Sequence, residues 1–419
     1  MLKLWRDPAV VRARERIVTR HPEIMRQQVA ISEIAAPTGE EGDRGEWMAR
    51  RFRALGLADV RRDEAGNIIA RRNGTVNQPA VVVCAHLDTV FPRTVPVSVR
   101  QEGDVLIGPG IGDNGRGLAA MLAIAEAIDG DKLRTRAPID FVATTCEEGT
   151  GNLRGAKYFF ENGAREARAA IIVDGPGDER IVTRALGSRR YRITYQGQGG
   201  HSWTAFGTPN PVHAAAIAAA RMASIRLPTS PRTTLSVARI GGGLAVNAIP
   251  GDGWLEVDLR SSSPAIINLL EREIRDAARF AAADQNERRE VGTPQLSCEI
   301  AVIGDRPCGE TSPDHPLVLV AAEATRLIQR EPDLAEASTD ANVPISMGIP
   351  AIAIGGGGRG GNAHTETEWY NGEGGAAGIS RALGIVVGSA SLHDYGEHGG
   401  GVLKEIDVQV PRLCSSPVL

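Results

Sequence analysis

The sequence predicts an α/β fold, a mostly parallel sheet flanked by helices, with a smaller βαββαβ domain inserted into it. Two observations predict this architecture. Short apolar runs alternate with helical patterns in the first and last parts of the chain, as they do in parallel α/β layers. Between these parts, four strand-like stretches and two helical patterns follow one another in the order of a ferredoxin-like sandwich.

The predicted domain organisation has four segments. The length of 419 residues exceeds that of one typical domain, which favours two folding units. We expect residues 1–187 and 305–395 to form the two parts of the α/β domain, and residues 188–304 to form the inserted domain. Residues 396–419 form a C-terminal tail with no predicted function.

The first part of the chain begins with helices. Apolar residues recur at helical spacing over residues 22–34 and 43–55. In the APTGEEG string between them, Pro37 and Gly39 end the first helix, and Thr38 with Glu41 resembles a capping box for the second. A helix is also predicted over Gly117–Ile128, and the apolar runs predicted as buried strands are 80–85, 139–145, 169–173 and 349–354.

The inserted domain is predicted from a change of pattern. Two of its strands alternate apolar and polar residues, and of its two helices the first is Ala-rich and the second is long and amphipathic. In chain order the elements are strand 191–195, helix 211–225, strands 233–240 and 254–260, helix 264–284 and strand 296–302. A four-stranded sheet has two exposed edges, where another subunit could pair, so we expect a homodimer through this domain.

Composition excludes several classes of protein. Charged residues make up 23% and the net charge is −4, which excludes a disordered chain and gives no basic signal for nucleic acid. Five scattered cysteines without a CxxC pair predict neither a disulfide framework nor a cysteine zinc site. The charged start does not resemble a secretory signal, and no apolar run is long enough to span a membrane. We therefore expect a cytoplasmic protein with no nucleic-acid or membrane partner.

Polar residues follow the predicted strands directly. The first buried strand runs into His86 and Asp88, the second into Glu147 and Glu148, and the third into Asp174. A glycine run links the last strand to His364, and Asp113 lies in a glycine-rich string before the next helix. Because ligands of open α/β sheets bind outside the carboxyl ends of the strands, these side chains should converge on one crevice.

This set of side chains is typical of a metal site. Two histidines with several carboxylates and no thiolate suit Zn²⁺, with Mn²⁺ or Co²⁺ as substitutes. Repulsion among so many acids also favours bound cations. Two metals about 3.5–4 Å apart need a bridging carboxylate, which Asp113 could supply. A single His or Asp after a strand is more often a cap or turn residue, but five such positions on one edge are harder to explain that way.

Five ordered strings resemble the dinuclear zinc exopeptidases and amidohydrolases. They are HLDTV, GIGDNGRG, EEGTGNLRGAK, VDG and AHTETEW. That family includes glutamate carboxypeptidase, tripeptide aminopeptidase, aminoacylase and succinyl-diaminopimelate desuccinylase. The resemblance covers roughly residues 25–390 and implies a zinc-exopeptidase-like fold with an inserted dimerisation and lid domain. The sequence departs from a common form of the family at Asn114, where a second acid is frequent.

The resemblance implies how two Zn²⁺ ions per subunit would be held. His86 and Asp174 would hold one zinc ion. Glu148 and His364 would hold the other. Asp113 would bridge the two.

The resemblance also implies roles for residues that do not bind metal. Asp88 would orient the imidazole of its neighbouring zinc ligand. Glu147 would be the general base, taking a proton from the attacking water and delivering it to the leaving amine. His201 matches a lid histidine that stabilises the oxyanion, commonly from the partner subunit. Asn247 and Arg260 match lid positions that engage substrate, and Arg260 suits a substrate carboxylate.

These observations predict a two-zinc hydrolase of peptide bonds in short peptides. The near alternative is a deacylase or amidase of N-acyl or N-carbamoyl amino acids, which needs the same site and differs only in its pocket. A noncatalytic metal-binding or assembly protein is an alternative of another class, but such a protein needs no free base at Glu147. A cysteine hydrolase using Cys84 or Cys146 is disfavoured, because Cys84 lies within an apolar strand. The sequence does not distinguish cleavage at the amino end from cleavage at the carboxyl end.

Overall fold

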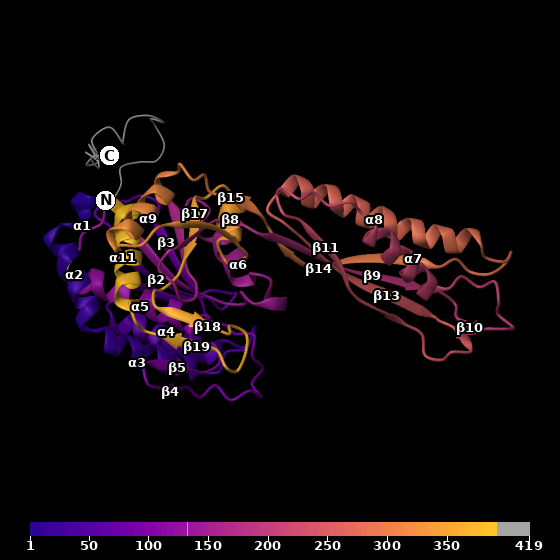
Figure 1. Ribbon diagram of the computed structural model, residues 1–419, viewed down its shortest axis with the longest axis horizontal. Helices are drawn as coiled ribbons and strands as arrows, with labels where there is room; N and C mark the ends of the chain where they lie inside the picture. Colours follow the sequence, from indigo (N-terminus) through magenta and orange to yellow (C-terminus); the bar gives the residue numbers. More distant parts are fainter. Residues whose placement is uncertain (132, 392–419) are drawn as a thin grey trace, which may run out of the picture.

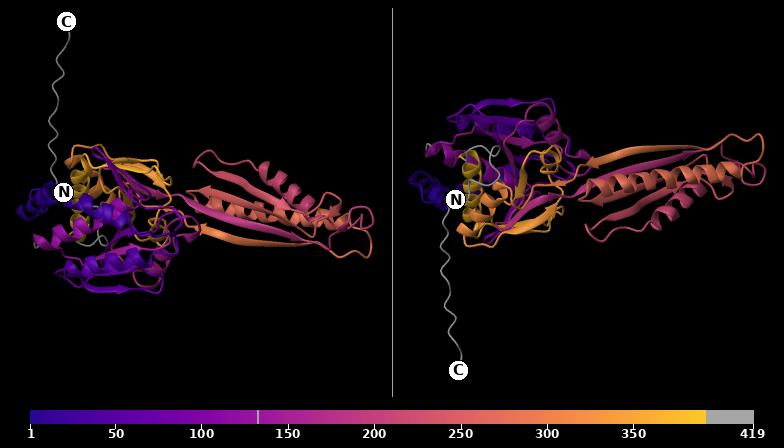
Figure 2. Two further views of the ribbon diagram at one scale, coloured as in Figure 1. Left: turned by 90° about the horizontal axis from the view of Figure 1, so that it is seen from below. Right: turned by 90° about the horizontal axis from the view of Figure 1, so that it is seen from above.

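The computed structural model describes residues 1–131 and 133–391. The chain forms a rounded α/β body from which an elongated second domain extends to one side (Figure 1). Figure 2 shows the same extension from below and from above. Within the described residues, no helix is long and apolar enough to cross a membrane. The predicted tail at residues 396–419 lies outside the described residues.

A nine-stranded mixed sheet forms the centre of the body. Its four central strands are parallel to one another and buried throughout, in the order β6 (Ile139–Thr144), β3 (Val81–His86), β7 (Ala169–Val173) and β17 (Ala351–Ile354). The outer strands, most of them antiparallel to their neighbours, are β1 (Ala58–Arg62), β2 (Ile68–Arg72), β8 (Arg180–Ala185), β15 (Gly309–Glu310) and β16 (Asp333–Ala337). The predicted fold class is confirmed, with the parallel strands at the centre.

Alternate residues of the central strands serve two separate cores. In β3, Val81 and Val83 face one core, whereas Val82 and Cys84 face the other. Because burying one such side chain contributes about 1.5–3 kcal/mol, a run such as AVVVCA is stable only between two layers. The helices that cover the first face are α2 (Pro8–Thr19), α3 (His21–Ser32), α4 (Gly42–Ala54), α5 (Gly115–Gly130), α9 (Pro316–Leu327) and α11 (Gly375–Ser391), and those of the second are α6 (Arg154–Asn162) and α10 (Asn342–Ser346).

The predicted capping box at the start of α4 is wrong. Glu41, and not Thr38, is the N-cap residue of α4, and no side chain makes a capping hydrogen bond there. The Thr38 hydroxyl donates to Asp88 Oδ2 at 2.9 Å, and Glu41 Oε1 accepts from the backbone nitrogens of Gly39 (2.8 Å) and Cys146 (3.0 Å). Both side chains therefore satisfy buried partners beside the strand ends, and these outweigh the local capping pattern.

The second domain is an antiparallel sheet covered by two helices. Its elements are β9 (Gly187–Gln196), α7 (Pro211–Ala223), β11 (Thr234–Gly242), β13 (Asp252–Ser261), α8 (Pro264–Glu287) and β14 (Ser297–Arg306), and the sheet order is β11-β13-β9-β14. The predicted βαββαβ order is therefore present. Tyr191, Ile193 and Tyr195 of β9 pack beneath the helices, and this domain has its own core. The exact boundaries at residues 187/188 and 304/305 stay a prediction.

Two small sheets complete the fold. One pairs β10 (Gly200–His201) with β12 (Ala248–Ile249), at the end of the second domain farthest from the body (Figure 1). The other lies on the body and has the order β18 (Arg359–Gly361), β19 (Trp369–Asn371), β5 (Val105–Ile107) and β4 (Arg100–Glu102). This second small sheet brings the chain around residue 110 next to the chain around residue 365.

Candidate active site

The carboxyl ends of three parallel strands place most of the predicted site residues together. His86 ends β3, Glu147 and Glu148 follow β6, and Asp174 follows β7 directly. Parallel strands present their carboxyl ends at the same edge, so these side chains meet there. His86 is 2% exposed, and its Nε2 lies 3.7 Å from Asp174 Oδ1.

Two loops close the site from the side opposite the strands. Asp113 Oδ1 lies 2.9 Å from His86 Nε2, and Asp113 Oδ2 lies 3.1 Å from His364 Nε2. The same His364 nitrogen lies 2.9 Å from Glu148 Oε1. Each oxygen of Asp113 therefore faces a different histidine, which is the arrangement expected of a carboxylate that bridges two metals.

The donor atoms fit two metal ions that share Asp113. His86, Asp113 and Asp174 offer ligand atoms within 4.8 Å of one another, and so do Asp113, Glu148 and His364. Imidazole and carboxylate ligands without thiolate are typical of Zn²⁺ and of harder divalent ions. The described residues thus satisfy the requirement for two neighbouring sites of three protein ligands each.

Charge in the site favours cations. A hydrogen bond to Asp113 raises the pKa of His364 to about 9, with help from the charge of Glu148 and against the lowering effect of burial. Burial lowers the pKa of His86, but its carboxylate partners, Asp113 first among them, raise it well above its ordinary value. The acids therefore draw protons onto both histidines, and a metal would take the place of those protons.

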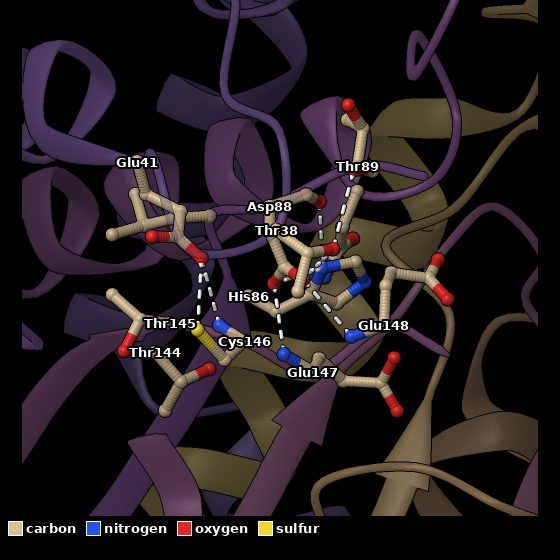
Figure 3. A network of polar contacts seen from close by, with 12 residues as sticks. Thr38, Glu41, His86, Asp88, Thr89, Thr144, Thr145, Cys146, Glu147 and Glu148 are labelled. Atoms are coloured by element: carbon tan, nitrogen blue, oxygen red, sulfur yellow. Dashed lines mark hydrogen bonds and ion pairs between the residues drawn. The ribbon is translucent and has the colours of Figure 1, made fainter. Parts of the chain in front are cut away.

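Asp88 holds the backbone that follows β6. The residue is fully buried, and its two oxygens accept from the backbone nitrogens of Glu147 and Glu148, each at 2.9 Å (Figure 3). Its backbone oxygen lies 3.0 Å from His86 Nδ1. Burial raises the pKa of the Asp88 carboxyl, but its hydrogen bonds, including those with His86 and both backbone amides, lower it below its ordinary value. These contacts fix the backbone that carries both glutamates and place Asp88 beside the imidazole.

Glu147 forms a third cluster of possible ligands with His86 and Glu148, and it is also held by an arginine. Glu147 Oε1 accepts from Arg306 Nη1 at 3.0 Å, and the Glu147 carbonyl accepts from Arg306 Nη2 at 2.5 Å. Burial raises the pKa of Glu147 well above its ordinary value, and the charge of Arg306 opposes that rise. Arg306 ends β14, the last strand of the second domain, and sequence reasoning missed it. A charged residue where the chain re-enters the body is the only signal it leaves in the sequence.

The substrate-binding residues implied by the resemblance lie apart from one another. His201 and Asn247 are neighbours, since the Ser202 nitrogen donates to the Asn247 carbonyl at 3.0 Å. His201 ends β10, which lies at the far end of the second domain (Figure 1), and Asn247 directly precedes β12, the strand paired with β10. Both residues are exposed, so this chain does not bring them to its own strand ends. Arg260 lies at the other end of β13 and pairs with Asp258 at 2.7 Å.

Arg260 is linked to the site through a chain of polar contacts. Asp258 also pairs with Arg190 at 3.0 Å. Arg190 Nη1 in turn donates to the Gly149 carbonyl at 3.3 Å. Gly149 follows Glu148 directly, so Arg260 lies on the side of the second domain that faces the body.

Asn114 connects the Asp113 loop to the strand that carries Asp174. Its side-chain nitrogen donates to the Val173 carbonyl at 2.9 Å, and its Oδ1 accepts from the Gly175 nitrogen at 3.1 Å. The same oxygen caps α5 by accepting from the Gly117 nitrogen at 2.9 Å. Asn114, at which the sequence departs from a common form of the family, is therefore a structural link. This link requires both a donor and an acceptor, whereas an ionised acid offers acceptors only.

Acids and histidines at the carboxyl edge of a mixed α/β sheet, with a second domain inserted beside them, define a metal-dependent hydrolase with a dinuclear site. The chain belongs to the peptidase family M20/M25/M40, whose model matches residues 82–386. It is therefore an enzyme of this family of peptidases and amidohydrolases.

Individual relatives agree with that assignment. The chain is 26% identical over 351 residues to protein YqjE of Bacillus subtilis (strain 168), covering 79% of this chain and 89% of the relative. It is 28% identical over 271 residues to a succinyl-diaminopimelate desuccinylase of Ectopseudomonas mendocina, covering 59% and 70%. The solved structure of a tripeptidase from Staphylococcus aureus matches with a TM-score of 0.73 at 24% identity, covering 88% of this chain and 98% of that one. This last likeness shows the fold.

Proposed function

We propose that the protein hydrolyses peptide bonds in short peptides with the help of two divalent metal ions. The observation that carries this proposal is Asp113, whose two oxygens face His86 and His364 at 2.9 and 3.1 Å. His86 and Asp174 would hold one metal, and Glu148 and His364 the other. Zn²⁺ is the proposed metal, with Mn²⁺ or Co²⁺ as substitutes.

The residues around the metal ligands have separate tasks in the proposed reaction. When bound, the metals supply Lewis-acid polarisation of the scissile carbonyl and make water a better nucleophile at neutral pH. Glu147 takes a proton from the attacking water and delivers it to the leaving amine. Because Arg306 holds Glu147 Oε1, the other oxygen of that carboxyl is the one we propose to carry the proton. The backbone carbonyl of Asp88 accepts from His86 Nδ1, which leaves Nε2 to face the metals.

The second domain is proposed to join two subunits and to complete the site. Its sheet ends on β11 and β14, which pair with no other strand on their outer sides within the described residues. Such edges suit pairing with a second copy. His201 and Asn247 are exposed far from their own strand ends, which supports their acting in the partner's site, His201 on the oxyanion. Arg260 is proposed to hold a carboxylate of the substrate.

The second candidate is removal of an acyl or carbamoyl group from an amino acid. The desuccinylase relative favours it, since that protein's name describes cleavage of an amide that is not a peptide bond. The likeness to a tripeptidase over nearly the whole chain favours short peptides.

A mixed substrate panel tests the proposal. Protein loaded with Zn²⁺, Mn²⁺ or Co²⁺ is incubated with dipeptides, tripeptides and N-acyl amino acids, and products are identified by mass spectrometry against a chelated control. We expect cleavage of di- or tripeptides that the chelator abolishes. Turnover of N-acyl amino acids alone would establish the second candidate. Binding of two metals with no turnover of any substrate would contradict both substrate classes, and absence of metal binding would contradict the catalytic proposal itself.

A further inference from the structure

Glu368 is a buried carboxylate that lies four residues after His364 and is outside the proposed ligand set. It is 2% exposed. Its Oε1 accepts from the backbone nitrogens of Gly112 (2.8 Å) and Asp113 (2.7 Å), and its Oε2 accepts from that of Gly110 (2.9 Å). Its own carbonyl accepts from the Gly108 nitrogen at 2.9 Å. One residue thus holds four backbone amides of a single loop.

These contacts are strong because they join an acid to amides in a buried place. Hydrogen bonds to an ionised acceptor are shorter and stronger than those between neutral groups. Buried amides without partners would also destabilise the loop. The loop allows such a close approach because residue 112 is glycine, where an added Cβ would lie 3.0 Å from Glu368 Oε1. The loop from Gly108 to Asp113 is therefore shaped around this carboxylate.

The segment from His364 to Glu368 has one function at each end. At one end it supplies the His364 side chain, whose Nε2 lies 3.1 Å from Asp113 Oδ2. At the other end it holds the Asp113 backbone nitrogen. No strand of the central sheet carries Asp113 or His364. The distance between these two side chains is therefore set by this segment.

We propose that Glu368 is a positioning residue that fixes Asp113 relative to His364 and thereby holds both metal positions in place. The inference rests on the proposed function for the roles of Asp113 and His364. It goes beyond that proposal by assigning the placement of the bridging carboxylate to a residue that touches neither metal nor substrate. Because Asp113 is shared, loss of Glu368 should weaken both metal sites together.

The test compares E368A and E368Q with the matched control D140A. Asp140 is also a buried carboxylate, 6% exposed, and pairs with Arg71 at 2.6 Å. It is the second residue of β6, at the end of that strand opposite Glu147. Metal-free protein is titrated with Zn²⁺ by calorimetry, bound metal is counted by mass spectrometry, and unfolding temperatures are measured for each variant.

We expect wild type and D140A to bind two ions with equal affinity, although D140A unfolds at a lower temperature. E368A should bind Zn²⁺ about 10- to 100-fold more weakly, the range typical of lost partners around a metal site. E368Q should lose less than E368A, since an amide keeps the shape and one acceptor oxygen. The visible spectrum of the Co²⁺-loaded protein should change in E368Q and stay the same in D140A.

Three results would overturn the inference. The first is wild-type affinity and stoichiometry in E368A. The second, which applies where E368A does not fold, is an E368Q variant that matches wild type in both affinity and Co²⁺ spectrum. Loss of affinity in D140A equal to that in E368A would show a general effect of instability. A different outcome, wild-type protein that binds no Zn²⁺, would contradict the proposed function, and this inference with it.

Discussion

The candidate site has two halves that are built differently. In the first half, His86, Glu148 and Asp174 lie at the ends of buried parallel strands, and their positions follow from the backbone hydrogen bonds of the sheet. In the second half, Asp113 and His364 lie on loops. The His86 side chain is 2% exposed, whereas that of His364 is 53% exposed.

The two halves are stabilised by different interactions. Apolar side chains on both faces of β3, β6 and β7 fix the strand-built half. Carboxylate and amide side chains fix the loop-built half, with Glu368 on one side of the loop and Asn114 on the other. A sheet edge can therefore supply part of a metal site directly, but the bridging ligand needs polar anchors of its own.

The largest expected effect comes from Glu147 in the strand-built half. In E147A, kcat should fall about 10²- to 10⁴-fold, because the group that carries the proton is removed. Bound metal should stay at the wild-type level, because both clusters that share Asp113 are complete without Glu147, which itself forms a third cluster with His86 and Glu148. Steady-state kinetics and metal analysis on the same preparation check this. Loss of metal in E147A would mean that Glu147, and not its neighbour, is a ligand.

The next prediction contrasts one ligand from each half. D113A should weaken both metals about 100-fold or more, because both clusters contain this residue. D174A should weaken only one, leaving about one tightly bound ion per subunit. Calorimetric titration with Zn²⁺ distinguishes the two patterns. Equal stoichiometry in D113A and D174A would contradict the bridging assignment.

Asp88 is the counterpart of Glu368 in the strand-built half. D88A removes the acceptor of two backbone amides and should weaken metal binding about 10- to 100-fold. We expect the loss to fall mainly on the metal held by His86. D88A keeps the backbone carbonyl that contacts His86 Nδ1. If D88A left that site unchanged, this carbonyl and the pairing of β3 with β6 would be sufficient to orient the imidazole.

The smallest expected effect concerns pH and the support of the loop-built half. His21 begins α3, close to Gly372 and Gly375 just after β19, and its Nε2 is buried with no hydrogen-bond partner among the described residues. Burial, together with the charge of Arg116, lowers the pKa of His21 to about 4. An unfolded histidine has a pKa of about 6.5.

The sign of the pH effect follows from proton uptake. Between about pH 6.5 and pH 4 the unfolded chain binds a proton at His21 that the folded chain does not, so the free energy of unfolding decreases as the pH falls through this window. H21Q should lose less stability there, by on the order of 1 kcal/mol, since the side chain is partly solvated. Urea unfolding of both proteins at pH 7 and pH 5 measures the difference. Identical losses would show that His21 titrates normally in the folded state.

Much of the strand-built half could be predicted from the sequence, because a short apolar run that ends in a polar residue carries its own signal. The βαββαβ order of the second domain was also readable from the alternation of apolar and polar residues. Strands such as β1, with the sequence ADVRR, could not be predicted because they are half exposed and have no apolar run.

Residues that act through distant partners left no signal. Arg306 meets Glu147 across 159 residues, and Glu368 meets the Asp113 backbone across 255. Thr38 and Glu41 fitted a local motif, but tertiary partners determined their contacts. The five ligand positions stood out only as an ordered set, and the roles of His201, Asn247 and Arg260 stay predictions.

The sequence separation of 251 positions from Asp113 to His364 also sets an order of assembly during synthesis. The ribosome completes β3, β6 and β7, and then the whole second domain, before it adds His364, the second histidine of the site. A nascent chain can therefore present the proposed ligands of one metal early, while the other proposed position stays without its histidine until synthesis is nearly finished. Maturation of the dinuclear centre is thereby tied to completion of the polypeptide, and a prematurely terminated product would lack the second half of its catalytic centre.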